Sequence, residues 1–225
     1  NVLFTTSQYS KQEITKNFDV DKEITLIYHG PTLDSPKETG TNFPAGNFFI
    51  YLGGYGGRKG LPKLLETYLK LYKAQKIRSS LLIVGKPSFI SSKFSAMLTE
   101  GKKLGVVEER GYVDDEELAS LLINARALIY PSRYEGFGLP PLEAMNLGCP
   151  VVTTRGTALP EICGEAVYYI DPDSDEDFYR AYMDLEFNSS LREELIQKGR
   201  KQASTFSWSK TANIFLHTLE NELKG

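Results

Sequence analysis

The sequence predicts an α/β protein in which helices cover both faces of a parallel sheet. Short apolar runs alternate with amphipathic segments of helix length along most of the 225 residues, which is typical of βα units. Hydrophobic residues make up 41% and charged residues 24%, the balance of a globular protein with a substantial core. In such folds ligands bind beyond the carboxyl ends of the strands, so the loops that follow strands are the first places to search.

The elements can be placed in order along the chain. We expect strands at 2–6, 23–29, 47–52, 81–84, 127–130, 151–153 and 166–170. The first helix is expected to begin near Ser10, where Ser10 and Glu13 form a capping-box pattern. Further helices are expected at 61–75 and within 90–104. Another is expected to run from a cap formed by Asp114 and Glu117 to Ala125. A short helix is expected at Pro140 and Pro141, and most of 171–223 is expected to be helical. Residues 31–46, rich in Thr, Ser, Pro and Gly, predict a connecting loop.

Composition and charge exclude several classes of protein. The net charge is −3, from 26 basic and 29 acidic residues, and nothing indicates a nucleic-acid partner. The longest apolar runs are well short of the roughly 20 residues that span a bilayer, and no signal-peptide pattern opens the chain. Cys149 and Cys163 are too few for a disulfide framework and lack metal-ligand spacing. We therefore expect a cytoplasmic location and no bound metal.

The most informative segment is residues 131–143, PSRYEGFGLPPLE, which follows an expected strand and enters a short helix. Gly136 and Gly138 let the backbone approach a ligand closely, because no Cβ stands in the way. The N–H groups that open the helix lack internal partners, and the helix dipole adds partial positive charge there. An anion such as a diphosphate is the natural ligand of this segment.

Two carboxylates frame the same segment. Glu135 lies in the loop and Glu143 in the first turn of the helix, on the same side of the expected pocket. A carboxylate accepts two hydrogen bonds, which suits the vicinal hydroxyls of a ribose or a hexose. Either glutamate alone is more often a capping or dipole residue, and Gly-Phe-Gly alone is more often only a turn. Two hydroxyl-binding acids on either side of a diphosphate cradle together fit a sugar nucleotide.

A glycine-rich turn at residues 53–60, GGYGGRKG, lies between another strand and helix. It departs from the dinucleotide fingerprint, because the sixth position counted from Gly54 is Lys59, and it lacks the Gly-Lys-Ser/Thr of a P-loop. Arg58 and Lys59 stand at a helix start, where the dipole disfavours cations, and this indicates an anion that offsets their charge. The plain alternative is that both are solvated surface charges.

The sequence gives no comparable evidence for a calcium site, another metal site or a catalytic nucleophile. Residues 171–177 offer alternating acids, but no Gly at the sixth position and no Glu at the twelfth exclude an EF-hand. His29 and His217 lack the partners of a metal site, and no Ser or Cys nucleophile has a recognisable setting.

The segment from Glu135 to Glu143, with Gly136-Phe137-Gly138-Leu139 between, resembles the E-x7-E signature of the group 1 retaining glycosyltransferases. Four further segments resemble patterns of that family: Gly111-Tyr112-Val113-Asp114, Gly148-Cys149-Pro150-Val151-Val152, Ala158-Leu159-Pro160-Glu161 and Ile170-Asp171-Pro172. The resemblance covers roughly residues 47–206. It implies one half of a GT-B fold, with a Rossmann-like, doubly wound domain at 47–206 that binds the nucleotide sugar.

The same resemblance implies a division of the remaining chain. Residues 1–30 would be the end of an N-terminal domain and the crossover, residues 31–46 the connecting loop, and residues 207–225 a C-terminal helix. Because the chain also opens within a strand-like pattern at residues 2–5, we expect a fragment of a longer protein.

Roles for single residues follow from the resemblance. Glu143 would bind the ribose hydroxyls, and Glu135 would lie beside the transferred sugar. Backbone groups of Gly136, Phe137, Gly138 and Leu139 would reach the sugar and the phosphates, and Gly111, Tyr112 and Val113 would form the turn that binds the base.

The family places an Arg just after the first strand and a Lys some residues later, both on the donor diphosphate. Lys59 matches the second of these positions. Gly54 stands at the first, which is a departure from the pattern, and we expect Arg58, directly before Lys59, to take that role.

The function implied is transfer of a hexosyl group from a UDP- or GDP-sugar to a glycan or lipid-linked acceptor, in polysaccharide or glycoconjugate biosynthesis. Transfer would retain stereochemistry by front-face attack, without metal or cofactor. Membrane contact would come only through a missing N-terminal domain, with the full-length protein cytoplasmic or peripheral at the membrane. Two alternatives stay open: a donor-binding module that is inactive without its N-terminal domain, and a GT-B relative such as a sugar-nucleotide epimerase, against which the E-x7-E pattern speaks.

Overall fold

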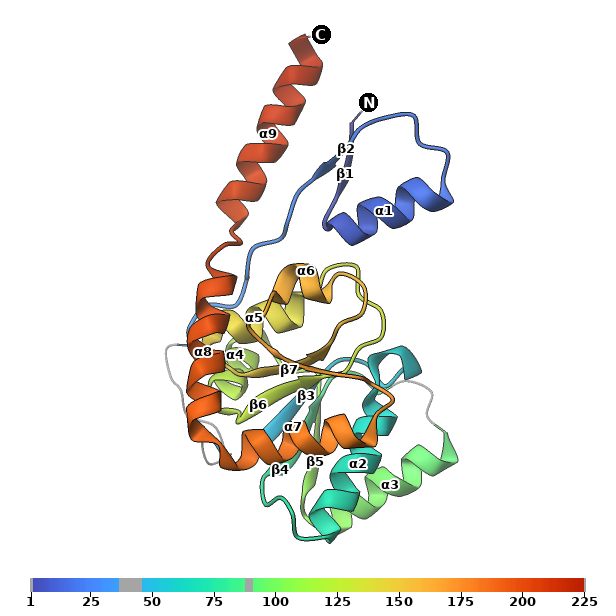
Figure 1. Ribbon diagram of the computed structural model, residues 1–225, viewed down its shortest axis with the longest axis vertical. Coiled ribbons are helices and arrows are strands. Elements are labelled where there is room, and N and C mark those ends of the chain that lie inside the picture. Colours follow the sequence, from blue (N-terminus) through green and yellow to red (C-terminus); the bar gives the residue numbers. More distant parts are fainter. Residues whose placement is uncertain (1, 37–45, 88–90, 225) are drawn as a thin grey trace.

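The computed structural model describes residues 2–36, 46–87 and 91–224, which form two parallel sheets surrounded by helices (Figure 1). The larger sheet has six strands in the order β5-β4-β3-β6-β7-β8, and every neighbouring pair is parallel. Its strands are β3 (Phe48–Leu52), β4 (Ser80–Val84), β5 (Val107–Gly111), β6 (Ala127–Tyr130), β7 (Val151–Thr154) and β8 (Tyr168–Ile170). The order is that of a doubly wound Rossmann-like sheet, so the expected fold class is confirmed.

The strand order reverses between β3 and β6, which are hydrogen-bonded neighbours with Phe49 opposite Ala127. In sheets of this order, ligands bind beyond the carboxyl ends of the strands at the point of reversal. The glycine-rich turn, with its 3-10 helix η1 (Gly57–Lys59), follows β3, and the loop that begins at Pro131 follows β6. Both predicted ligand loops therefore lie at the switch point of the sheet.

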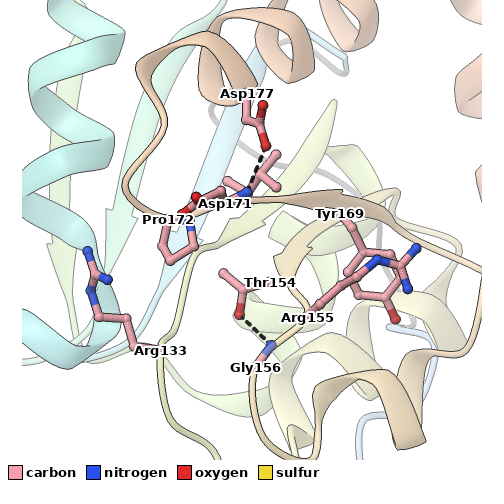
Figure 2. A pocket seen from close by; sticks show the side chains of 9 residues that line it. Arg133, Thr154, Arg155, Gly156, Tyr169, Asp171, Pro172 and Asp177 are labelled. Carbon is pink, nitrogen blue, oxygen red and sulfur yellow. Dashed lines mark hydrogen bonds between the residues drawn. The ribbon is translucent and has the colours of Figure 1, made fainter.

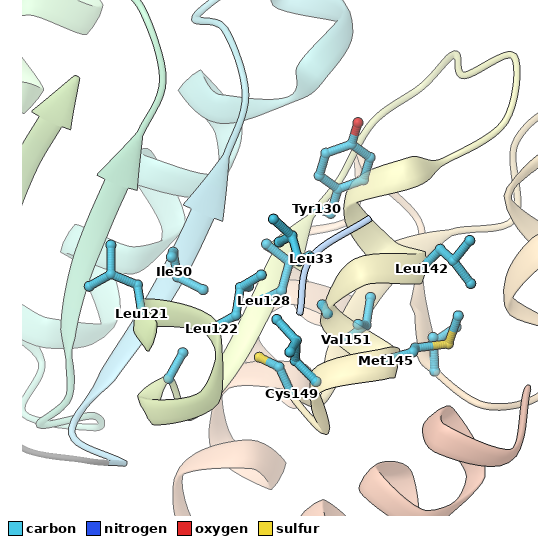
Figure 3. Packing of buried hydrophobic residues seen from close by; sticks show 14 of the residues in the cluster. Leu33, Ile50, Leu121, Leu122, Leu128, Tyr130, Leu142, Met145, Cys149 and Val151 are labelled. Atoms are coloured by element: carbon cyan, nitrogen blue, oxygen red, sulfur yellow. The ribbon is translucent and has the colours of Figure 1, made fainter. Parts of the chain in front are cut away.

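Helices cover both faces because successive strand residues point to opposite sides. Phe48 and Ile50 pack into one apolar cluster, part of which Figure 3 shows, with α4 (Asp115–Asn124), α5 (Leu139–Leu147) and α6 (Leu159–Cys163). Phe49 and Tyr51 pack into a second cluster with α2 (Leu61–Lys73), α3 (Ser92–Lys103) and α7 (Asp175–Phe187). A strand buried on both faces has to be apolar throughout, which is why β3 is a continuous hydrophobic run.

A small unit at the N-terminus has its own two-stranded parallel sheet, formed by β1 (Leu3–Thr5) and β2 (Ile24–Leu26) and joined by α1 (Gln8–Asn17). After α8 (Ser189–Ala203), α9 (Trp208–Lys224) extends along this unit (Figure 1). The rings of Phe4 and Phe215 lie 4.9 Å apart between centroids. Segments from the two ends of the chain are thus neighbours, whereas residues 37–45 of the expected connecting loop lie outside the described residues. None of the helices in the described ranges is long and apolar enough to cross a membrane.

Two local expectations are wrong. The capping box at Ser10 and Glu13 does not start α1, because Ser7 is the N-cap. The backbone of Ser7 is extended, and its hydroxyl accepts a hydrogen bond from the amide of Ser10. Strand β5 was not expected, because its sequence VEERG is mostly charged. It lies at the edge of the sheet, where charged residues are common since they discourage pairing with another chain.

Candidate active site

The glycine-rich turn after β3 packs closely against the loop after β6. Gly60 has a φ of 74°, and a Cβ at this position would lie 2.4 Å from the carbonyl oxygen of Pro131, so only glycine fits. The amide of Arg133 donates to the carbonyl oxygen of Arg58 at 2.8 Å. These backbone contacts join the two predicted ligand loops and fix the position of Lys59.

Lys59 and Glu135 form an ion pair between these loops, with 2.5 Å separating Lys59 Nζ from Glu135 Oε1. The same Oε1 accepts hydrogen bonds from the hydroxyls of Tyr130 at 2.8 Å and Ser132 at 2.6 Å. Lys59 Nζ also donates to the hydroxyl oxygen of Tyr130 at 2.8 Å. We call these four residues the Glu135 cluster. The two charged side chains are only 18% and 12% exposed, so two residues predicted to be catalytic meet in a largely buried contact.

The Glu135 carboxylate is held in its ionised form. Burial by itself would raise its pKa, but hydrogen bonds from Lys59, Ser132 and Tyr130 favour the charged form and hold the pKa of Glu135 below the ordinary value of 4.5. Burial and the neighbouring Glu135 carboxylate raise the pKa of Tyr130, which therefore remains a hydroxyl donor. At neutral pH the cluster presents one anion and one cation bridged by a phenol.

Arg58 stands at the rim of the site rather than in the cluster. Its side chain is exposed, and its Nη1 donates to the carbonyl oxygen of Tyr134 at 2.8 Å. A guanidinium has five N–H donors, so this single bond leaves others for a ligand. The structure therefore allows Arg58 and Lys59 to bind one anion together, as expected, with Arg58 on the solvent side.

The backbone at the start of α5 is the part of the loop open to a ligand. Gly138 has a φ of 109° and forms the N-cap, and no side chain among the described residues caps this helix. Because Pro140 and Pro141 have no N–H, the helix end can offer an anion only the amides of Gly138 and Leu139. Phe137 is buried with its ring 4.8 Å from that of His29, and Leu139 packs on the core, so their side chains serve packing.

Glu143 is buried, 4% exposed, and binds residues 27–36, which follow β2 and which we call the crossover segment. Its Oε1 accepts the amide and the hydroxyl of Thr32, each at 2.7 Å, and its Oε2 accepts the amide of Leu33 at 3.0 Å. A carboxylate has about four acceptor positions, so these three bonds leave room for one further donor. Glu143 is the fifth residue of α5, past the first turn in which it was expected, because the helix begins only at Leu139. Glu143 and Glu135 therefore belong to two separate hydrogen-bonded groups.

Gly54 lies on the exposed side of the glycine-rich turn. Its carbonyl oxygen accepts the hydroxyl of Tyr51 at 2.7 Å. Next to it, a Cβ on Gly85, at the end of β4, would lie 2.2 Å from the carbonyl oxygen of Gly53. The backbones that follow β3 and β4 therefore touch at Gly53, whereas Gly54 is exposed and a Cβ on it would meet nothing within 4 Å.

The predicted base-binding residues lie at the end of β5, which is three strands from β6 in the sheet. Gly111 has a φ of 68° and turns the chain at the end of the strand. Tyr112 is 75% exposed, with Lys86 Nζ 5.7 Å from its ring centre, whereas Val113 is buried. The turn offers an exposed aromatic face at the carboxyl edge of the sheet.

Several contacts come from residues that the sequence analysis did not single out. Tyr130 and Ser132 flank the end of β6, and their polar groups at a strand's carboxyl end were a signal that could have been used. The Thr157 hydroxyl accepts the amide of Glu135 at 2.9 Å, and Thr157 has a φ of 58°. No local pattern links Thr157 to Glu135, or Thr32 to Glu143, because these pairs meet only through the fold.

A cavity of about 500 Å³ opens beside the site, at the carboxyl ends of β7 and β8 (Figure 2). Its lining includes Arg133, Arg155, Tyr169 and Asp171. None of the predicted site residues lines it, and we assign the candidate site by its charged contacts rather than by this hollow. Among the residues described, no group of three or more His, Cys, Asp or Glu could hold a metal ion.

Comparison with known proteins decides the family. The family model described as glycosyl transferases group 1 matches residues 37–202. The chain belongs to the group 1 glycosyltransferases. It is 31% identical over 217 residues to the O-antigen chain mannosyltransferase B of Escherichia coli, an alignment that covers 92% of this chain and 57% of that protein. The resemblance to the group 1 glycosyltransferases, read from the E-x7-E segment, is confirmed.

Two solved structures share the fold. Sucrose-phosphate synthase from Thermosynechococcus elongatus has a TM-score of 0.77 at 24% identity, covering 98% of this chain and 57% of its own. The Anabaena protein Alr3699/HepE, in complex with UDP and glucose, has a TM-score of 0.78 at 18% identity, covering 98% of this chain and 63% of its own. The alignments span 57% of the mannosyltransferase and 57% and 63% of the two solved structures, in agreement with one half of a GT-B fold.

Proposed function

We propose that the chain is the donor-binding half of a retaining glycosyltransferase that moves a hexosyl group from a nucleoside-diphosphate sugar to an acceptor hydroxyl. The observation that carries this proposal is the Lys59–Glu135 pair, 2.5 Å apart at the point where the strand order reverses. That position suits a ligand with a negative diphosphate on one side and sugar hydroxyls on the other. The similarity to a mannosyltransferase and the likeness to a protein bound to UDP and glucose support it.

On the phosphate side, we assign charge stabilisation to Lys59, Arg58 and the amides of Gly138 and Leu139. An ammonium group has three donors, and Lys59 uses one on Glu135 and one on Tyr130, so one remains for a phosphate oxygen. As the bond from the sugar to the diphosphate breaks, negative charge grows on the leaving group and these fixed donors stabilise it. Because cationic side chains are present for this task, we propose transfer without a metal ion or cofactor.

On the sugar side, we assign Glu135 an orienting and electrostatic role. All of the hydrogen bonds to its carboxylate from the described residues go to Oε1, which leaves Oε2 to accept from a sugar hydroxyl. In the front-face mechanism that we propose, the acceptor oxygen bonds to the anomeric carbon on the side from which the diphosphate leaves. The proton of the acceptor hydroxyl passes to the departing phosphate oxygen, so Glu135 need not form a covalent bond.

On the nucleoside side, we assign the ribose to Glu143 and the base to the turn at Gly111, Tyr112 and Val113. Glu143 has one acceptor position beyond its bonds to Thr32 and Leu33. A ribose hydroxyl either uses that position or displaces the exposed Thr32 hydroxyl. A UDP- or GDP-sugar fits this assignment equally.

We place the whole protein in polysaccharide or glycoconjugate biosynthesis, with a glycan or lipid-linked acceptor, as the name of the mannosyltransferase relative suggests. Both cysteines are free and buried, which favours the cytoplasm, with any peripheral membrane contact made by sequence beyond this chain. Because relatives are longer, we expect this chain to bind a donor but to need the remaining half for transfer.

Calorimetric titration with UDP-, GDP- and ADP-sugars tests the proposal. One of these series should bind, and Lys59→Met should weaken its binding about tenfold, the equivalent of about 1.4 kcal/mol. Lys198→Met, which removes the same charge from an exposed ion pair with Glu194 on α8, should change affinity less than about twofold. Binding by none of the three series would contradict the donor site. So would binding whose affinity Glu143→Ala leaves unchanged.

A further inference from the structure

The N-terminal end of α1 is the point where the small N-terminal unit meets the candidate site. A helix start leaves amides without partners and carries partial positive charge. Ser7 satisfies the amide of Ser10, but no acidic residue stands in the first turn of α1 to serve the amides of Gln8 and Tyr9. Those two amides need an acceptor from elsewhere in the chain.

Glu161 of α6 supplies that acceptor. Its Oε1 accepts the amide of Gln8 at 2.7 Å, and its Oε2 accepts the amide of Tyr9 at 3.2 Å, across 153 and 152 residues of sequence. The hydroxyl of Tyr28, in the crossover segment, also donates to Oε1 at 2.7 Å. Figure 1 shows α6 directly facing α1. One carboxylate thus binds both the helix and the crossover, with its negative charge at the positive end of α1.

The same end of α1 holds the loop that carries Glu135. The hydroxyls of Ser7 and Ser10 lie 2.6 Å and 3.0 Å from the carbonyl oxygen of Gly136 and donate to it. A trans peptide is planar, so fixing this carbonyl toward α1 turns the next amide, that of Phe137, to the opposite side. The position of α1 therefore sets the orientation of the peptide that joins Gly136 to Phe137, one residue beyond Glu135.

We propose that Glu161 is a positioning residue: it holds α1 against the Gly136 carbonyl and thereby fixes the geometry of the Glu135 loop for transfer. The inference rests on the proposed function of Glu135. Glu161 itself contacts none of the residues assigned to the diphosphate or the ribose. Its removal should impair the chemical step and leave donor affinity unchanged.

Glu161→Gln in the whole protein tests this inference. The amide keeps the size of the side chain, but it carries no charge and presents an NH₂ group to one of the two helix amides. We expect kcat to fall about tenfold or more, since small displacements of reacting groups have effects of that size, with the donor Kd changed less than about twofold. Glu194→Gln, a matched loss of charge at the exposed pair with Lys198, should leave both values unchanged.

Hydrogen exchange gives a readout that does not depend on activity. The amides of Gln8 and Tyr9 should exchange faster in Glu161→Gln than in the parent protein, while amides of the six-stranded sheet keep their rates. An unchanged kcat, unchanged exchange at Gln8 and Tyr9, or a rise in donor Kd that matches the fall in kcat would overturn the inference. If the parent protein transfers no sugar, the proposed function fails, and the exchange rates still decide whether Glu161 holds α1.

Discussion

The charged pair at the centre of the site is only partly neutralised by its own contacts. Lys59 uses two of its three donors within the protein, and Glu135 uses one of its two carboxylate oxygens. The pair is therefore ordered before any ligand arrives, yet each member keeps one position open. A ligand with phosphate on one side and hydroxyls on the other fits that arrangement better than a simple anion does.

The depressed pKa of Glu135 predicts how stability depends on pH. Because its folded-state pKa lies below the ordinary value of 4.5, ionised Glu135 stabilises the fold above that value, and the contribution is lost as pH falls through the folded-state pKa. Glu135→Gln should lower the free energy of unfolding by about 1–3 kcal/mol at neutral pH, measured by urea denaturation. The difference from the parent should shrink as the pH is taken below 4.5.

The control for this experiment is Glu176→Gln on α7. Glu176 is 69% exposed in a surface pair with Arg180, so its loss should cost less than about 1 kcal/mol at any pH. A difference between Glu135→Gln and the parent that stays constant from neutral pH into acid would show that the charge of Glu135 is not what stabilises the loop.

Among the secondary-structure elements, α2 and α5 begin at the site without a side-chain cap. α2 and α5 begin at Gly60 and Gly138, both with positive φ, and their first turns contain no acidic residue. By contrast, α4 and α7 begin with side-chain caps and acidic first turns. The first turns of α2 and α5 thus hold neither a capping side chain nor an acid, which would suit the binding of an anion.

Gly60 offers a test at the scale of the element, with Gly105 as a matched control. The two glycines have φ of 74° and 70°, but a Cβ on Gly60 would meet the Pro131 carbonyl at 2.4 Å, whereas Gly105 has nothing within 4 Å. Gly105→Ala should cost about 1–2 kcal/mol, the strain of a left-handed residue. Gly60→Ala should cost clearly more in urea denaturation, and it should also weaken nucleotide binding because Lys59 adjoins it.

An equal loss of stability in the two alanine variants would contradict this prediction. Equal losses would mean that the backbone conformation alone requires glycine at position 60, and that the contact between the turn and the β6 loop has no energetic weight.

At the scale of the whole molecule, carboxylates of the larger domain hold the crossover and the N-terminal unit. Glu143 of α5 binds Thr32 and Leu33, and Glu161 of α6 binds Tyr28 and the start of α1. The helices that cover one face of the sheet thus also fix the position of the chain that precedes the sheet. Through them, the packing of a single apolar cluster supports both the candidate site and the crossover segment.

The two cysteines report on that cluster. Burial raises the pKa of both the Cys149 and the Cys163 thiol to about 12, so neither should react with a thiol reagent at neutral pH while the protein is folded. Because both lie in the cluster with β3, α5 and α6, their labelling in urea should follow the same transition as loss of far-UV circular dichroism. Labelling before that transition would show that this face of the sheet opens separately, and Cys163→Ser would identify which thiol is responsible.

The sequence by itself determined the features that depend on neighbouring residues. The buried strands were predictable because a strand covered on both faces is an unbroken apolar run, and β3 and β6 are such runs. The two ligand loops were predictable because glycines and charges directly follow these strands. Local signals failed where local chemistry was misleading: the charged edge strand β5 was missed, and Ser7, three residues before Ser10, caps α1.

Only the tertiary structure decided which of these residues meet. Lys59 and Glu135 are 76 residues apart, Thr32 and Glu143 are 111 apart, and Gln8 and Glu161 are 153 apart. Each pair forms because the strand order places β6 beside β3 and because the crossover returns across α5 and α6. Hydrogen bonds of this range depend on strand order and on the path of connections, and a local pattern of residues encodes neither.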